Sequence, residues 1–147
     1  MNDQKAVEVL LVEDNPRDAE LTIRALKRHN LANRLHHVED GAEALDFLFG
    51  RGKYEGRLSD AVPRVILLDL KLPKVSGLEV LRLMKEDPRL STIPAVIVTS
   101  SAEDPDMQAA YQLGANSYVV KPVTFDEFME AMSKLGVYWL ILNRPLK

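Results

Sequence analysis

Residues 64–77 read Arg-Val-Ile-Leu-Leu-Asp-Leu-Lys-Leu-Pro-Lys-Val-Ser-Gly, an apolar run that ends on Asp69 and passes into a sharp turn. Such a short, nearly unbroken apolar run predicts a strand that is buried on both faces of a sheet. Ser76 and Gly77 then open an amphipathic helix, so the stretch predicts a strand, a turn and a helix in succession. Asp69 is therefore placed at the carboxyl end of a strand, where open α/β sheets bind their ligands.

The rest of the chain repeats this alternation of short apolar runs and longer amphipathic segments. Strands are expected at residues 7–12, 34–39, 64–69, 95–99 and 117–120, and helices at about 16–30, 41–49, 77–87, 105–114 and 124–142. Repeated βα units predict a parallel sheet with helices on both faces. The run at 34–39 is the most polar, so we expect it at an edge of the sheet. In the first helix, Leu21, Ile23 and Leu26 are expected to supply the apolar face.

The composition narrows the class of protein. A chain of 147 residues that is 46% hydrophobic and 28% charged is typical of one soluble globular domain. The net charge of −3 gives no sign of the basic face expected of a nucleic-acid binder. The absence of cysteine excludes disulfides, thiolate metal sites and cysteine nucleophiles. No apolar stretch approaches the ~20 residues that cross a bilayer, so we expect a cytoplasmic protein with no membrane contact.

We expect a single domain over residues 1–147, with no linker and no appended output domain. A polar tail is expected at residues 1–6, and the C-terminal helix at 124–142. A long polar connection at residues 50–63 separates the second helix from the third strand. Connections of this length in compact domains are often functional; a tolerated surface insertion is the simpler interpretation here.

Acidic side chains follow two of the predicted strands. Glu13 and Asp14 end the run at 7–12, and Asp69 ends the run at 64–69. Each acid alone would be read as a helix cap or a turn residue, but three at adjoining strand ends repel one another and favour a cation. Magnesium takes a few carboxylate oxygens and completes its octahedron with water and phosphate oxygens. The acids therefore predict a Mg²⁺ site.

Two further strand ends add a hydroxyl and an amine, from Thr99 and Lys121. A lysine ammonium pairs with a carboxylate at rest and with a phosphoryl oxygen after transfer, and a hydroxyl donates to the same oxygens. A carboxylate nucleophile, a metal, a cation and a hydroxyl donor are the groups that in-line phosphoryl transfer needs. Asp69 is thus the expected nucleophile, with Lys121 and Thr99 stabilising charge on the transferred group.

These residues lie within motifs that resemble the receiver domain of bacterial response regulators, the CheY-like superfamily. The motifs are Val12-Glu13-Asp14-Asn15, Leu67-Leu68-Asp69-Leu70-Lys71-Leu72-Pro73 with Gly77, Val98-Thr99-Ser100, and Lys121-Pro122. The resemblance covers nearly the whole chain, in order and at matching spacing. It implies a flavodoxin-like (βα)5 fold, a doubly wound sheet of five parallel strands in the order 2-1-3-4-5, which is an order known for this fold family.

The resemblance also implies roles for single residues. Asp69 matches the phosphorylated aspartate, Glu13 and Asp14 match the acidic pair, and the backbone carbonyl of Lys71 matches the third protein contact to the metal. Thr99 matches the switch hydroxyl.

The resemblance also implies which residues match the family's lysine, its switch aromatic and the positions around the acyl phosphate. Lys121 matches the family's lysine, and the Lys121–Pro122 bond matches a cis peptide. Tyr118 matches the switch aromatic. Lys71 and Ser101 match positions that border the acyl phosphate and influence its lifetime. Because the first acid is Glu13 rather than aspartate, its metal contact is expected to be indirect, through water.

A receiver domain of this kind is expected to pass its signal through its own surface. Phosphoryl oxygens would draw Thr99 inward and Tyr118 would fill the vacated space, which changes the face formed by residues 105–114, 117–120 and 124–142. The end of the last expected helix, 137–142, is apolar nearly all round and must be covered. We therefore expect a homodimer through this face.

Within the family, the Val-Glu-Asp-Asn-Pro opening, the 50–63 connection and the apolar tail resemble stand-alone regulators of bacterial and cyanobacterial phytochrome histidine kinases. This narrower resemblance implies a light-sensing histidine kinase as phosphodonor.

Two rival functions remain open on the sequence. A magnesium-dependent phosphohydrolase of the haloacid-dehalogenase type also uses an aspartyl phosphate, but it needs an acid two residues after the nucleophile, where this chain has Lys71. A phosphorylation-independent interaction domain would have no use for Asp14, Asp69, Thr99 and Lys121 together. A nucleotide-binding protein is disfavoured, because the sequence contains neither a G-x-x-x-x-G-K-[ST] loop nor a G-x-G-x-x-G motif. We therefore expect a signalling module rather than a turnover enzyme.

Overall fold

The structure is a computed structural model that describes residues 8–27, 34–56, 62–100 and 104–134. Its five strands are β1 (Val9–Val12), β2 (Leu35–Val38), β3 (Val65–Leu68), β4 (Ala95–Thr99) and β5 (Ser117–Val120). All neighbouring pairs are parallel, in the order β2-β1-β3-β4-β5. The predicted flavodoxin-like fold is confirmed, and the polar strand β2 lies at an edge as predicted.

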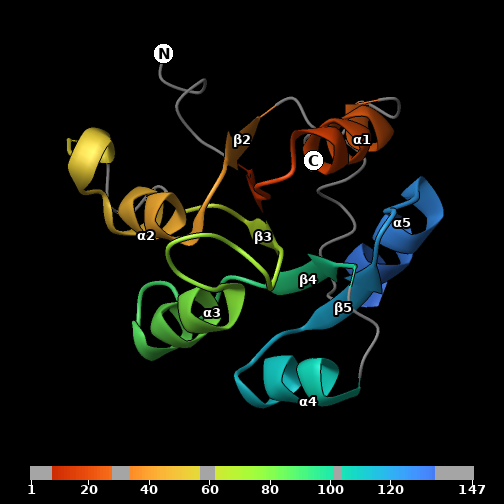
Figure 1. The fold of residues 1–147 in the computed structure, drawn as a ribbon. Coiled ribbons are helices and arrows are strands. Elements are labelled where there is room, and N and C mark those ends of the chain that lie inside the picture. The colour runs from red at the N-terminus through yellow and green to blue at the C-terminus, as the bar shows by residue number, and fades with distance from the viewer. Residues whose placement is uncertain (1–7, 28–33, 57–61, 101–103, 135–147) are drawn as a thin grey trace, which may run out of the picture.

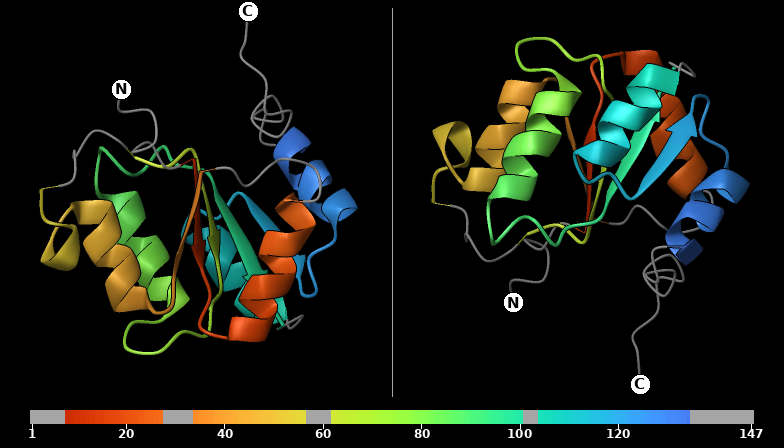
Figure 2. Two further views of the ribbon diagram at one scale, coloured as in Figure 1. Left: turned by 90° about the horizontal axis from the view of Figure 1, so that it is seen from above. Right: turned by 90° about the horizontal axis from the view of Figure 1, so that it is seen from below.

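Helices cover the two faces of this sheet. They are α1 (Pro16–Lys27), α2 (Gly41–Phe49), α3 (Gly77–Glu86), α4 (Asp104–Gln112) and α5 (Phe125–Lys134), with a short 3₁₀ helix η2 (Gly52–Tyr54) after α2. Helices α2, α3 and α4 lie on one face, and α1 and α5 on the other (Figures 1 and 2). The sheet is therefore the middle of three layers.

The core divides along the sheet because side chains alternate between its faces. On β3, Ile66 and Leu68 belong to the cluster beneath α2, α3 and α4, whereas Val65 and Leu67 belong to the cluster beneath α1 and α5. All four side chains are fully buried. Burial on both faces explains why the run is apolar without interruption, and it leaves the strand's end as the first place for a polar residue.

Local caps fix where the helices begin. The Asn15 side chain caps α1, because it accepts hydrogen bonds from the backbone N–H groups of Arg17 (2.9 Å) and Asp18 (3.0 Å). The Ser76 hydroxyl caps α3 in the same way through Glu79 N, at 3.2 Å. These caps direct the helices away from the carboxyl edge of the sheet.

The apolar face predicted for α1 is partly wrong. Leu21 is 43% exposed, and the residues that face the sheet are Ala19, Thr22 and Leu26, with Ile23 partly buried. Ala19, Thr22 and Leu26 follow the spacing i, i+3, i+7 of one helical stripe, and Leu21 falls outside it. The predicted Leu26 lies on this stripe, but the other two positions are a small residue and a threonine, so leucine content alone was misleading at Leu21.

Several predicted boundaries reach residues outside the described ranges. For the first helix these are residues 28–30, and for the last helix residues 135–142. Part of the 50–63 connection, residues 57–61, and the N-terminal tail also lie outside the described residues. The described part of the connection contains η2, whose Tyr54 hydroxyl donates to Glu43 Oε2 at 2.7 Å. No helix among the described residues is long and apolar enough to cross a membrane.

Candidate functional site

Three carboxylates meet at the carboxyl edge of the central strands. Glu13 and Asp14 follow β1, and Asp69 follows the neighbouring strand β3. One oxygen from each lies within 4.8 Å of the others. Glu13 and Asp69 are buried, whereas Asp14 is exposed. The structure thus brings together the three acids that the sequence predicted, with one of them open to solvent.

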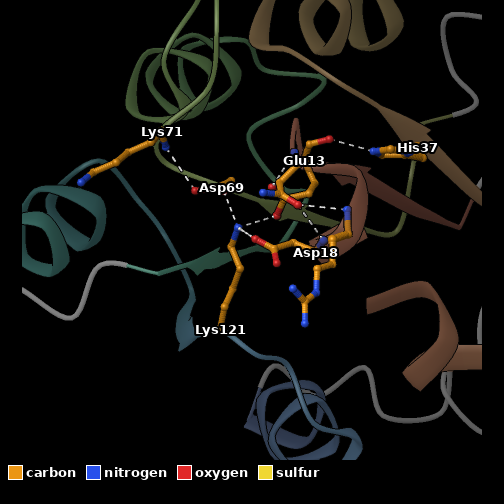
Figure 3. Close-up of polar contacts among 8 residues, drawn as sticks. Glu13, Asp18, His37, Asp69, Lys71 and Lys121 are labelled. Atoms are coloured by element: carbon orange, nitrogen blue, oxygen red, sulfur yellow. Dashed lines mark hydrogen bonds and ion pairs between the residues drawn. The ribbon is translucent and has the colours of Figure 1, made fainter. Parts of the chain in front are cut away.

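Lys121 extends from the end of β5 into this cluster (Figure 3). Its Nζ lies 2.8 Å from Asp69 Oδ2, 2.8 Å from Glu13 Oε1 and 2.9 Å from Asp18 Oδ2. The lysine side chain is only 10% exposed. One buried ammonium therefore neutralises carboxylates from two strand ends and from the first turn of α1.

Burial and hydrogen bonding shift the pKa values of Glu13 and Lys121. Burial raises the pKa of Glu13 above its ordinary value, although hydrogen bonds from Lys121 and from Asn15 N oppose the shift. Burial alone would lower the pKa of Lys121, but hydrogen bonds to Asp18, Asp69 and Glu13 outweigh burial and raise the pKa of its ammonium. Lys121 is therefore a firmly protonated cation at neutral pH.

The turn after Asp69 is held closely against α3. The Lys71 N–H donates to Asp69 Oδ1 at 3.2 Å, and the Gly77 N–H donates to the Leu70 carbonyl at 2.8 Å. A side chain at Gly77 would place its Cβ 2.0 Å from the carbonyl oxygen of Asp69, so only glycine fits there. The Lys71 side chain extends away from the carboxylates in Figure 3. Of Lys71, only the backbone faces the site.

Thr99 and Tyr118 lie on β4 and β5, beside the site. Thr99 is fully buried, and its carbonyl accepts a hydrogen bond from Lys121 N at 2.8 Å. The Lys121–Pro122 peptide is cis, as the resemblance implied. The Tyr118 ring is half-buried and lies 6.4 Å, between centroids, from the ring of Tyr111 on α4. The predicted switch residues are thus on the elements that join the site to α4. Ser101 lies outside the described residues.

Two residues of the site were not predicted from the sequence. Asp18 pairs with Lys121, and the His37 Nε2–H donates to the Glu13 carbonyl at 2.8 Å from the neighbouring strand β2 (Figure 3). Asp18 lies in the first turn of α1, shortly after the strand-end acids Glu13 and Asp14, and this closeness in sequence could have indicated it. His37 had no such signal, because its role depends on the pairing of β1 with β2.

The donor set fits a hard divalent cation. Three carboxylates that include an exposed one offer oxygen ligands at an open edge, and magnesium and manganese prefer such ligands. Lys121 neutralises only part of the charge, because it is a single cation facing Glu13, Asp69, Asp18 and the nearby Asp14. The remaining negative charge favours a metal ion beside Asp14, on the solvent side of the cluster.

Comparisons with known proteins agree with the fold. Residues 9–133 match the family model of the response regulator receiver domain. The chain is 42% identical over 136 residues to the probable methanogenesis regulatory protein FilR2 of Methanothrix harundinacea, covering 92% of this chain and 85% of that protein. It is 36% identical over 132 residues to response regulator Rcp1 of a Synechocystis species, covering 90% and 88%.

Solved structures give the same result. The bacteriophytochrome response regulator AtBRR aligns with a TM-score of 0.83 and 51% identity, covering 94% of this chain and 98% of that one. The Mn²⁺-bound form of Rcp1 aligns with a TM-score of 0.76 and 36% identity, covering 96% and 99%. A divalent ion is therefore bound by a structural relative whose sequence is also related to this chain.

Proposed function

The chain belongs to the response regulator receiver domain family, and we propose that it is a single-domain regulator of a two-component system that accepts a phosphoryl group on Asp69. The observation that carries the proposal is the 2.8 Å contact between Lys121 Nζ and Asp69 Oδ2 at a buried strand end, beside two further carboxylates. This contact supports the proposal, because a carboxylate that could act as the nucleophile, a fixed cation and carboxylate oxygens that could hold a metal ion lie close together.

The transfer follows from these contacts. A carboxylate oxygen of Asp69 attacks phosphorus, and a P–O bond forms as the P–N bond to the donor's imidazole breaks. The electron pair of that bond stays on the imidazole nitrogen. Lys121 remains protonated because its pKa is raised, so it can stabilise a phosphoryl oxygen as charge develops. The buried hydroxyl-bearing residue Thr99 would supply a second donor to the same group.

We propose Mg²⁺ as the physiological ion, held by Asp14, Asp69 and the backbone carbonyl of Lys71, with Glu13 acting through water. When bound, the ion would neutralise the charge shared by the carboxylates and the phosphoryl group. Two hydrogen bonds hold the backbone of Glu13 in place. The His37 Nε2–H donates to the Glu13 carbonyl at 2.8 Å, and the Glu13 N–H donates to the Val38 carbonyl at 3.0 Å.

The output is proposed to be a changed surface rather than a released product. Movement of Thr99 towards the phosphoryl group would let Tyr118 move inward, and this would change the face formed by α4, β5 and α5. That face would then bind a partner or a second copy of the chain. Return to the resting state needs only water to attack phosphorus, which releases inorganic phosphate and restores the Asp69 carboxylate.

We propose a sensor histidine kinase as the phosphodonor, and a bacterial phytochrome as its specific class. The support is the similarity to the bacteriophytochrome response regulator AtBRR. The names of the relatives FilR2 and Rcp1 mention no light receptor. A direct test mixes this protein with an autophosphorylated bacteriophytochrome kinase and measures transfer of labelled phosphate. Transfer within minutes supports the assignment. Equal or faster transfer from an unrelated histidine kinase would remove it.

The phosphorylation itself can be tested without a kinase. We expect incubation with Mg²⁺ and acetyl phosphate to add one alkali-labile phosphate, seen by intact mass. Asp69→Asn should abolish the adduct, and chelation of Mg²⁺ should reduce it. Asp87→Asn is the matched control, because Asp87 lies at the distant end of α3.

The rival hydrolase gives a different result in the same experiment. Sustained release of inorganic phosphate at roughly 1 per second or faster would identify a turnover enzyme. We expect a single loading of Asp69 followed by slow loss, because Lys71 occupies the place of the acid that hydrolysis would need.

A further inference from the structure

The ammonium group of Lys121 has no spare hydrogen in this structure. A lysine ammonium has three N–H donors, and Lys121 Nζ lies 2.8–2.9 Å from oxygens of Glu13, Asp18 and Asp69. A phosphoryl oxygen arriving on Asp69 can gain a hydrogen bond from Lys121 only if one of these contacts is released or shared. The environment of the three carboxylates in the resting site therefore determines which of them releases Lys121.

Asp18 differs from the other two partners in place and in exposure. Its side chain is 32% exposed, against 2% for Glu13 and 7% for Asp69. It comes from the first turn of α1 rather than from a strand end. The cap made by Asn15, which binds Asp18 N at 3.0 Å, fixes that turn whether or not the Asp18 carboxylate pairs with Lys121.

Releasing Asp18 costs less than releasing Glu13. A carboxylate that is a third exposed can be solvated where it stands, whereas a buried one would be left without its counter-ion. Glu13 is also held by a 3.1 Å hydrogen bond from Asn15 N. Asp69 cannot be the contact that is lost, because it carries the phosphoryl group in the proposed reaction.

We propose that Asp18 is a positioning residue that holds Lys121 at rest and competes with the phosphoryl group for its ammonium. This inference rests on the proposed phosphorylation of Asp69. By occupying the third hydrogen of Lys121, Asp18 keeps the lysine extended into the site, and it weakens the hold of the site on a phosphoryl group until that contact is exchanged. Asp18 thereby sets the balance between the resting and the phosphorylated state.

The test compares Asp18→Ala with Glu20→Ala, which removes the same charge from an exposed position of α1 paired only with exposed Arg24 in the described contacts. Beryllofluoride, a mimic of the phosphoryl group, is titrated in excess Mg²⁺ and its binding followed by ¹⁹F NMR. We expect about threefold tighter binding for Asp18→Ala, within the roughly 1.4- to 5-fold range that a partly exposed charge pair supplies. Glu20→Ala should bind as the unaltered protein does.

Two additional readouts separate positioning from damage. Asp18→Glu keeps a carboxylate beside Lys121 and should restore the original beryllofluoride affinity. The midpoint for Mg²⁺ alone should be alike in Asp18→Ala and Glu20→Ala, because Asp18 is outside the group of metal-ligating carboxylates. A purely structural role would weaken beryllofluoride binding in Asp18→Ala together with folding stability.

The outcomes also separate this inference from the proposed function. Unchanged or weaker beryllofluoride binding in Asp18→Ala overturns the competition, even where acetyl phosphate still phosphorylates Asp69. An unaltered protein that takes up neither phosphate nor beryllofluoride overturns the proposed function and this inference together. Tighter binding in Asp18→Ala, with Glu20→Ala unchanged, supports both.

Discussion

At the scale of single residues, Lys121 determines how buried acids can share one site. Glu13 and Asp69 are buried beside each other, and their charges would otherwise repel. Burying a charge is costly unless it is paired and hydrogen-bonded. Lys121 supplies that partner from the far end of the sequence, so the stability of the fold and the chemistry of the site depend on the same side chain.

Lys121→Met should therefore destabilise the metal-free protein, by about 3 kcal/mol at pH 7, because it leaves buried carboxylates unpaired. The sign follows from the raised pKa of Lys121: its contribution is fully present below the unfolded pKa of 10.5 and is lost as pH rises through the higher folded value. Urea unfolding at several pH values measures the loss.

Lys134→Met is the control for this change, because Lys134 is 69% exposed and its ion pair with Glu130 is long, at 3.7 Å. We expect its effect to stay near zero. Equal losses for the two variants would show that Lys121 does not hold the carboxylates together.

At the scale of elements, the turn between β3 and α3 determines where Asp69 points. The hydrogen bond from Gly77 N to the Leu70 carbonyl closes the turn, and Lys74 within it has a left-handed backbone, with φ of 71°. The turn also reaches the start of α2, where the Gly41 N–H donates to the Pro73 carbonyl at 3.3 Å. Both α2 and α3 thus contact the segment that follows Asp69.

Gly77→Ala should disrupt this turn. Its Cβ would lie 2.0 Å from the Asp69 carbonyl oxygen, so the backbone of Asp69 or of α3 must move. We expect a loss of roughly 2 kcal/mol or more, as is usual for a substitution that strains the backbone. Gly56→Ala is the comparison, because nothing lies within 4 Å of its added Cβ and only its positive φ is unfavourable.

Thermal unfolding of Gly77→Ala and Gly56→Ala, together with the yield of acetyl phosphate labelling, tests whether the turn positions Asp69. A Gly77→Ala protein with unchanged melting and labelling would show that the turn does not position Asp69.

A second element-scale prediction concerns the contact between α2 and η2. Burial would raise the pKa of Glu43, but hydrogen bonds from Lys53, Tyr54 and Glu39 N outweigh it and lower the pKa to about 2. A depressed carboxyl pKa adds stability above the unfolded value of 4.5, and this stability is lost as pH falls from 4.5 to about 2.

Glu43→Gln should thus cost about 1–2 kcal/mol at pH 7 after allowance for solvent screening, and only about a few tenths of a kcal/mol at pH 2. Denaturant unfolding at both pH values measures this difference. Glu20→Gln serves as the control, since its pair with Arg24 is 65% exposed on each side. A loss for Glu43→Gln that persists at pH 2 would contradict the assignment.

At the scale of the whole molecule, exposed apolar side chains indicate where a second copy would bind. Among the described residues, the large apolar side chains that are exposed are Leu21, Tyr111 and Val120. Tyr111 on α4 and Val120 on β5 lie on the face expected to change on phosphorylation, whereas Leu21 is on α1. The apolar stretch at 137–142 lies outside the described residues, so the proposed homodimer rests here on Tyr111 and Val120.

We predict that the protein is a dimer, and that Tyr111→Glu shifts it towards the monomer, because burying a carboxylate in the interface is costly. Light scattering after size-exclusion chromatography, with and without beryllofluoride, gives the mass. Leu21→Glu is the matched control on α1 and should leave the dimer intact. A monomeric unaltered protein at high concentration would remove the proposal, and dissociation by Leu21→Glu alone would place the interface on α1.

The sequence determined most of the fold because the strands are short, apolar and regularly spaced, and helix caps such as Asn15 and Ser76 are local signals. The convergence of Glu13, Asp14, Asp69 and Lys121 followed from placing each at a strand end. Asp18, His37 and the inward positions of Ala19 and Thr22 on α1 were missed. Their roles follow from the packing of α1 and β2 beside β1. This packing is made by contacts between residues that are distant in sequence.

The proposed function requires Asp69 to be the residue that accepts the phosphoryl group. Borohydride reduces an aspartyl phosphate to the primary alcohol with loss of phosphate, which leaves the hydroxyethyl side chain of homoserine at a position that peptide mass spectrometry identifies. After treatment with Mg²⁺ and acetyl phosphate, we predict reduction at Asp69 and at no other carboxylate. Reduction at Asp14 or elsewhere, with Asp69 unmodified, would contradict the account.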